Sequence, residues 1–171
     1  MRKMLKWVLV LVAALCAGSV RATPPSGFSG TTVAMGRFGD ITVKLRAFMP
    51  ENARQEDEES FWASIQKTRG DSDLYVQNNV WAPGGTTGWH SHPGHSLIIV
   101  TSGAVTAYEG DDPSCTPHVY TVGMGFVDPG GAHVHVLRNE GSVEARTVAV
   151  QLIPAGATRR IDAAAPFGCG F

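Results

Sequence analysis

The chain has 171 residues and a formal net charge of −1, from 14 basic and 15 acidic side chains. Four of the basic residues and none of the acidic ones lie in the first 22 positions, so the remaining 149 residues carry ten basic against fifteen acidic groups, a net charge of −5. This balance offers no basic surface for nucleic acid or for anionic lipid, and the length suits one domain rather than two.

The first 22 residues are typical of a secretory signal peptide. Three basic residues precede an apolar run over 7–17, and Val20-Arg21-Ala22 offers small or apolar residues at the usual cleavage positions. The apolar run is too short for a membrane-spanning helix, although an uncleaved N-terminal anchor is the alternative. We therefore predict a periplasmic or secreted protein that has no membrane contact after cleavage.

The next segments predict a leader, a strand and a helix. Residues 23–39 are rich in Gly, Pro, Ser and Thr with little apolar periodicity, which indicates a flexible leader on the surface. Residues 40–48 alternate between apolar and polar side chains, as a strand does. Acidic residues crowd the first half of 51–67 and apolar ones follow it, so we expect one short helix there.

The rest of the chain is predicted to be strands throughout. Turn-forming residues separate short apolar runs at intervals of about ten residues, without any alternation of strands and helices, which favours a β-sandwich or β-barrel over residues 40–171. The Ser102-Gly103 turn makes 104–109 the expected hairpin partner of 97–101. The predicted strands are 74–82, 97–101, 104–109, 117–122, 125–127, 133–137 and 145–153.

Cys115 and Cys169 are the only cysteines beyond the predicted signal peptide. An even number of cysteines in an exported protein favours a disulfide, which would tie the C-terminal tail over 167–171 to the loop after Glu109. Two free thiols are the alternative. Because no CxxC spacing exists, neither redox catalysis nor a thiolate zinc site is expected.

Three of the six histidines lie within six positions, at His90, His92 and His95. In an extended strand His90 and His92 share a face, so both imidazoles can converge on one cation. Any single histidine is more simply explained as a hydrogen-bonded core or surface residue. A second pair makes metal binding the favoured interpretation.

His133 and His135 form that second pair, after a turn over 129–131. Neutral imidazole suits iron, zinc, copper and nickel, whereas magnesium and calcium prefer oxygen ligands. We therefore predict one divalent transition metal held by His90, His92, His133 and His135.

These motifs resemble the paired motifs of the cupin superfamily over residues 80–154. The shared features are Gly84, His90-Ser91-His92 and Gly103, then Gly123, the Pro129-Gly130 turn, a histidine and Asn139. The resemblance implies a single antiparallel jelly-roll barrel with the histidines around one divalent ion in its mouth. The runs 87–94 and 126–131 further resemble small bacterial single-domain cupins of no assigned activity.

The sequence departs from the cupin pattern in two places. A glutamate normally follows the second histidine by four or five positions, but Ser96 and Leu97 stand there. His95 is the nearest substitute, unless it is a loop residue that faces solvent. His133 has the family's distance from the Pro129-Gly130 turn and His135 has its distance from Asn139. We favour His133 as third ligand, with His135 as a fourth ligand or a supporting group.

Two hypotheses of function follow. The first is a non-catalytic protein that holds a metal or a small-molecule ligand, and the second is a metal-dependent enzyme, such as a dioxygenase or isomerase, that acts on a small organic molecule. The missing glutamate favours the first, because a carboxylate commonly completes a redox-active iron site. Glu109, Asp128, Glu140 and Glu144 are candidate bases only by elimination.

Trp89 bears on the oligomeric state. Next to His90 on a strand, it is expected to point away from the metal and toward the surface. An exposed tryptophan and the family resemblance together favour a homodimer.

Overall fold

The computed structural model describes residues 22–48, 61–166 and 168–171. These residues form strands, turns and loops, and no helix among them is long and apolar enough to cross a membrane. The strands are β1 (Ser26–Phe38), β2 (Thr42–Phe48), β3 (Phe61–Lys67), β4 (Ser72–Thr86), β5 (His90–Ser91), β6 (Ser96–Ser102), β7 (Ala104–Glu109), β8 (His118–Thr121), β9 (Gly125–Asp128), β10 (His135–Arg138), β11 (Ala145–Pro154) and β12 (Ile161–Asp162).

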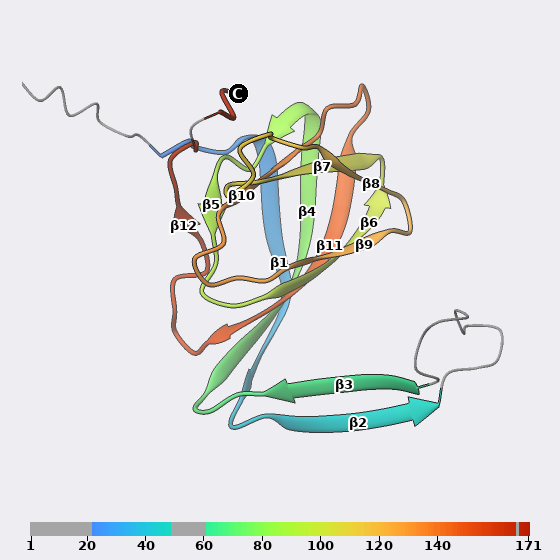
Figure 1. Ribbon diagram of the computed structural model, residues 1–171, viewed down its shortest axis with the longest axis vertical. Coiled ribbons are helices and arrows are strands. Elements are labelled where there is room, and N and C mark those ends of the chain that lie inside the picture. Colours follow the sequence, from blue (N-terminus) through green and yellow to red (C-terminus); the bar gives the residue numbers. More distant parts are fainter. Residues whose placement is uncertain (1–21, 49–60, 167) are drawn as a thin grey trace, which may run out of the picture.

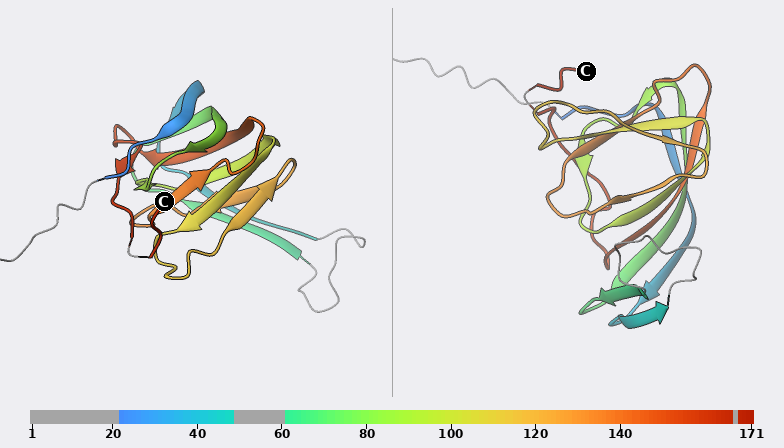
Figure 2. Two further views of the ribbon diagram at one scale, coloured as in Figure 1. Left: turned by 90° about the horizontal axis from the view of Figure 1, so that it is seen from above. Right: turned by 45° about the vertical axis from the view of Figure 1, so that its right-hand side comes forward.

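Ten of these strands form one antiparallel sheet that curls into a nearly closed barrel (Figures 1 and 2). The order β12-β5-β10-β4-β11-β6-β9 runs along the sheet, while β1 pairs with β4 and β7 pairs with β10 and β8. The prediction of an all-β protein is confirmed, and the barrel is consistent with a jelly roll. The remaining strands, β2 and β3, pair with each other in a two-stranded sheet that projects from the barrel (Figure 1).

The barrel core is built from alternate residues of its strands. In β6 and β11 buried positions alternate with more exposed ones, because successive side chains of a strand point to opposite faces. Phe28 of β1 packs on Trp81 of β4, with ring centroids 4.9 Å apart. The buried cluster around Trp81 also contains Val105, Ala107, Leu137 and Ala145.

A second apolar cluster lies under the C-terminal tail. Trp89 is only 1% exposed and is buried with Tyr108, Val136 and Cys169. The predicted disulfide joins Cys115 to Cys169, with the two Cα atoms 5.7 Å apart, and Phe171 stacks on Trp89 at 6.2 Å between ring centroids. The prediction of a surface-exposed Trp89 is therefore wrong, and the homodimer loses that support.

Residues 26–38, which the sequence predicts to be part of a flexible leader, form strand β1. The strand pairs with β4 from Ser26, opposite Thr86, to Phe38, opposite Ser72. Most of its side chains are exposed, so hydrogen bonds between backbones hold it in place more than apolar burial does. Such a strand leaves no apolar period in the sequence, which explains the difference.

The predicted helix over 51–67 is wrong for residues 61–67, which form β3; residues 49–60 lie outside the described part of the chain. Trp62 and Ile65 suggested a buried helical face, but they are 51% and 75% exposed. Pairing with β2 along the whole strand decides the structure instead.

The predicted hairpin between β6 and β7 does not form. β6 pairs with β11 and β9, whereas β7 pairs with β10 and β8. Gly103 has a φ of 66° at the corner between them, and a Cβ there would lie 2.7 Å from the carbonyl oxygen of Glu144. The short connection therefore joins two strands that pair with different partners in the barrel.

Candidate metal centre

Three imidazoles meet inside the barrel, from β5, the loop after it, and β10. His90 of β5 is directly opposite His135 of β10, and their ring centroids are 4.4 Å apart. The ring of His92 lies 4.8 Å from that of His90 and 5.5 Å from that of His135. One ligand atom from each of the three lies within 4.8 Å of the others. The structure thus places His135 with the His90/His92 pair.

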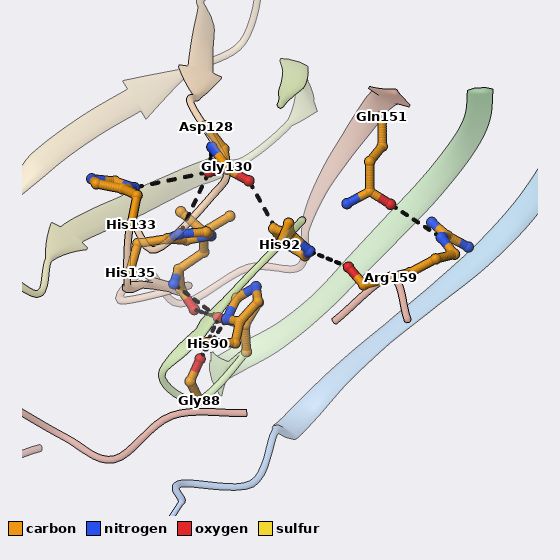
Figure 3. Close-up of polar contacts among 11 residues, drawn as sticks. Gly88, His90, His92, Asp128, Gly130, His133, His135, Gln151 and Arg159 are labelled. Carbon is orange, nitrogen blue, oxygen red and sulfur yellow. Dashed lines mark hydrogen bonds and ion pairs between the residues drawn. The ribbon is translucent and has the colours of Figure 1, made fainter. Parts of the chain in front are cut away.

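Backbone carbonyl groups orient two of these rings (Figure 3). The Nδ1 atom of His90 lies 2.8 Å from the carbonyl oxygen of Gly88, and the Nδ1 atom of His92 lies 2.5 Å from that of Arg159. A carbonyl oxygen only accepts hydrogen bonds, so in each neutral ring Nδ1 carries the proton and Nε2 keeps its lone pair. Both rings can therefore bind a metal through Nε2.

A carboxylate joins the histidines from the end of β9. Asp128 is 5% exposed, and its Oδ2 atom lies 3.6 Å from Nε2 of His92. Its Oδ1 atom accepts a hydrogen bond from the backbone N–H of Gly130 and lies 3.7 Å from Nδ1 of His135. Asp128, His133 and His135 form a second group with ligand atoms within 4.8 Å of one another. His135 belongs to both groups.

His133 occupies the outer part of the cluster. Its Nε2 atom lies 2.7 Å from Oε2 of Glu109, and its Nδ1 atom lies 3.9 Å from Oδ1 of Asp128. Burial raises the pKa of Glu109, and His133 opposes that effect. With one nitrogen on Glu109, His133 has its other nitrogen facing Asp128, where it can act as a further ligand or position the carboxylate.

Burial keeps the innermost imidazoles neutral. It lowers the pKa of His90 to about 2, helped by His135, Arg160 and His92. Burial also lowers the pKa of His135 to about 4, although Asp128 acts in the opposite direction. Since only a neutral imidazole has a lone pair for a metal, both residues are in the ligand form at physiological pH.

Glycines allow the two motif turns to touch. A Cβ on Gly130 would overlap the carbonyl group of Gly94, and a Cβ on Gly94 would overlap the carbonyl oxygen of Leu152. The close approach of these backbones brings the turn after His92 against the turn after Asp128. Close packing therefore requires glycine at positions 94 and 130, whatever the conformation of the two turns.

A cavity of about 260 Å³ lies beside the cluster, and His90, His92, His135 and Asp128 line it. Its lining includes apolar side chains, namely Phe28, Trp81, Ile98, Leu137 and Ala149. The lining also includes polar side chains, among them Gln77, Asn79, Gln151, Arg159 and Arg160. The cluster therefore faces a space in which a small molecule can bind.

The other two histidines lie away from the centre. His95 lines a separate hollow with Ile65, Leu152 and neighbouring residues, and His118 is exposed on β8. Among the described residues, neither belongs to a group of potential metal ligands. His95 therefore does not take the place of the glutamate that the cupin pattern expects.

Asp128, Glu109 and Arg159 are the residues that sequence reasoning missed or left undecided. Asp128 and Glu109 were candidates only by elimination. The one local signal for Asp128 is its position directly before the Pro129-Gly130 turn of the second motif. Nothing in the sequence indicates that the backbone of Arg159 contacts His92, because the two residues are 67 positions apart.

Residues 80–151 match the family model described as Cupin domain. This match and the antiparallel barrel support assignment to the cupin superfamily. The chain finds no match among curated proteins.

Several solved structures are similar over about half of the chain. Oxalate oxidase shares 24% identity over 48% of this chain and 46% of its own, with a TM-score of 0.41, so the match spans about half of that protein. A conserved protein with a double-stranded beta-helix domain from Klebsiella pneumoniae shares 24% identity over 54% of this chain and 74% of its own, with a TM-score of 0.42. Peruvianin-I from Thevetia peruviana latex, described as a cysteine peptidase, shares 26% identity over 53% of this chain and 56% of its own, with a TM-score of 0.43.

Proposed function

We propose that the protein binds one divalent transition metal on His90, His92 and His135, with Asp128 and His133 completing the group. The observation that carries this proposal is the convergence of three imidazoles within 4.8 Å, two of them oriented through Nδ1 by backbone carbonyls. Iron, zinc, copper and nickel all accept such a donor set.

Unpaired polar atoms in the cluster fit a bound cation. Oδ2 of Asp128 and the Nδ1 atoms of His133 and His135 are buried and have no hydrogen-bond partner among the described residues. A buried polar atom without a partner costs about 1–3 kcal/mol. A cation within the cluster would compensate that cost, since lone pairs and a carboxylate are what it requires. The residues present therefore suit the metal.

A metal in this position supplies Lewis-acid or redox chemistry to a molecule in the adjacent cavity. The chain itself orients the imidazoles through the carbonyl groups of Gly88 and Arg159. Apolar side chains, among them Phe28, Trp81 and Ile98, offer contacts to the apolar part of such a molecule. The cavity favours a second candidate function, a metal-dependent dioxygenase or isomerase that acts on a small organic molecule.

Metal analysis of the purified protein tests the first function. After growth in medium that contains iron, zinc, copper and nickel, we expect about one equivalent of metal per chain by mass spectrometry. His90→Ala, His92→Ala and His135→Ala should each lose the metal, whereas His118→Ala should retain it. Equal loss in all four variants, or no metal in the wild type, would overturn the proposal. Oxygen uptake on a candidate substrate would support the enzyme.

We also infer that the protein is exported. The pattern of residues 1–22 and the disulfide between Cys115 and Cys169 support export, because disulfides persist in oxidising compartments. Cell fractionation followed by N-terminal sequencing should find the chain outside the cytoplasm and beginning at Thr23. A cytoplasmic chain that begins at Met1 would contradict the inference.

A further inference from the structure

Arg159 is a cation that lines the cavity and has no counterion among the described residues. Its side chain lines the cavity together with His90, His92 and His135, yet it forms no ion pair with any carboxylate in the described ranges. Burial lowers the pKa of its guanidinium, which reflects the partial loss of water around it. Arg160 differs, because its Nε atom lies 2.5 Å from a carboxylate oxygen of Asp162.

Neutral groups hold the Arg159 guanidinium in place without compensating its charge. Its Nε donates to Oε1 of Gln151 at 3.1 Å, and its Nη1 donates to Oγ1 of Thr32 at 2.9 Å. The guanidinium carbon also lies 4.0 Å from the centroid of the Tyr75 ring. Because these contacts fix the orientation in advance, a bound anion would lose little free energy in ordering the side chain.

Amide donors accompany the guanidinium. Gln151 uses Oε1 to accept from Arg159, so its Nε2 amide is turned to another side and has no partner in the part of the chain that the structure describes. The side chain of Gln77 likewise makes no hydrogen bond with a described residue. Both glutamines line the cavity. A guanidinium beside two amides is a suitable set of donors for a carboxylate.

The inward positions of two paired strands lead from Arg159 through polar residues to an apolar end of the cavity. On the paired strands β4 and β11, the inward pairs run from Tyr75 with Gln151, through Gln77 with Ala149 and the polar pair Asn79 with Thr147, to Trp81 with Ala145. The last pair belongs to the buried apolar cluster, and Phe28 and Ile98 line the cavity nearby. A ligand that fits this gradient has a charged head at Arg159 and a short apolar body.

We propose that the cavity binds a small organic monocarboxylate, with its carboxylate on Arg159 and Gln151 and its apolar body toward Trp81. The single positive charge of Arg159 matches the single negative charge of a monocarboxylate. A phosphate dianion carries a second negative charge, which the carboxylate of Asp128 on the cavity wall would repel. The proposal rests on the proposed function in one respect, because it places this substrate class beside the same histidine cluster.

Arg159 connects the two sites. Its backbone carbonyl positions His92, while its guanidinium contacts Gln151 of the cavity wall, so a carboxylate held there would share the cavity with the histidine cluster. Replacement of the side chain leaves the carbonyl in place. Variants of Arg159 therefore separate carboxylate binding from metal binding.

Binding of butanoate to the metal-free protein tests the proposal, with butanamide as the uncharged analogue of the same shape. By NMR titration we expect butanoate to bind about ten-fold or more tightly than butanamide, because hydrogen bonds to charged groups are the stronger ones. Arg159→Gln should lower the affinity for butanoate by about ten-fold or more, and Arg159→Lys by less. Arg146→Gln is the control, because Arg146 is an exposed arginine of β11 paired with Glu144.

Several results would overturn the proposal, and most of them concern the wild-type protein. Equal binding of butanoate and butanamide by the wild type, no saturable butanoate binding, or tighter binding of inorganic phosphate would each do so. Unchanged butanoate affinity in a folded Arg159→Gln protein would also do so. Metal affinity measured on Arg159→Gln should equal that of the wild type. If the wild type binds butanoate but no metal, the proposed function fails and this inference stands.

Discussion

Asp128 lies directly opposite Ser96 on the neighbouring strand, and both side chains are buried at the wall of the same cavity. Ser96 stands four positions after His92, where the cupin pattern usually has its glutamate. The carboxylate therefore reaches the histidines from β9 instead of β6. The cluster thus contains a carboxylate although the first motif lacks one.

Asp128→Asn should weaken metal binding while leaving the barrel folded. Asparagine keeps the size of the side chain and an oxygen for the backbone N–H of Gly130, but it removes the negative charge beside the imidazoles. We expect a loss of about 10- to 100-fold in metal affinity, measured by competition with a chelating dye. Glu144→Gln removes a charge from the outer surface, where Glu144 pairs with Arg146, and should have no such effect.

A paired substitution tests whether position 96 can supply the carboxylate. In a protein that carries Asp128→Ser, the further change Ser96→Glu should restore part of the lost affinity, because the two positions face each other across the strands. If Asp128→Asn binds metal as well as the wild type, the carboxylate is not a ligand and the four histidines alone form the site.

The sequence predicted which histidines contribute to this cluster better than it predicted which of them lie next to one another. Spacing indicates that His90 and His92 share a face, since local alternation decides that. It does not indicate whether His133 or His135 joins them, because strand alternation assigns both to one face and the choice depends on where β10 begins and pairs with β5. The same limit applies to Asp128 and Arg159, which approach the cluster through contacts between distant segments.

The strands likewise divide into those that the sequence predicts well and those that it does not. Strands with buried alternate residues, such as β6 and β11, leave a period in the sequence and were predicted closely. β1 and β3 expose most of their described side chains, so their strand structure depends on partners that periodicity does not reveal. Pairing is likewise non-local: the corner at Gly103 looks like a hairpin turn until the partners of β6 and β7 are known.

The metal-free protein should lose stability as the pH falls below the ordinary range of histidine. In the unfolded chain His90 and His135 titrate near 6.5, but in the folded protein their pKa values are lowered to about 2 and about 4. Between these values the unfolded state binds more protons, so the free energy of unfolding decreases with decreasing pH. From about pH 6 to about pH 5 we expect a loss on the order of 2 kcal/mol, from two groups at roughly 1.4 kcal/mol per unit each.

Urea unfolding across this pH range measures the effect. His90→Gln removes one of the two groups, so the dependence of its unfolding free energy on pH should be about half as steep, whatever its absolute stability. A slope equal to that of the wild type would show that His90 is not held neutral by burial.

Reduction of the disulfide should destabilise the protein and expose Trp89, which the C-terminal tail covers. The bond closes a separation of 54 residues, which the chain-entropy model values at about 4 kcal/mol at most. Cys169 and Phe171 pack against the buried Trp89 from the same tail. The double variant Cys115→Ser with Cys169→Ser should therefore unfold at lower urea concentration and show red-shifted tryptophan emission. Unchanged emission would mean that Phe171 keeps the tail in place without the bond.

Gly88→Ala should impair both stability and metal binding, whereas Gly84→Ala should impair only stability. Both glycines have positive φ angles, 66° and 74°, so alanine costs about 1–2 kcal/mol at either position. A Cβ on Gly88 would also collide with the carbonyl oxygen of Thr23, while a Cβ on Gly84 meets nothing within 4 Å. The carbonyl of Gly88 orients His90, so the displacement needed to relieve the collision moves a ligand. Urea unfolding and metal titration of both variants should show the larger losses for Gly88→Ala, and equal metal affinities would contradict the role assigned to this carbonyl.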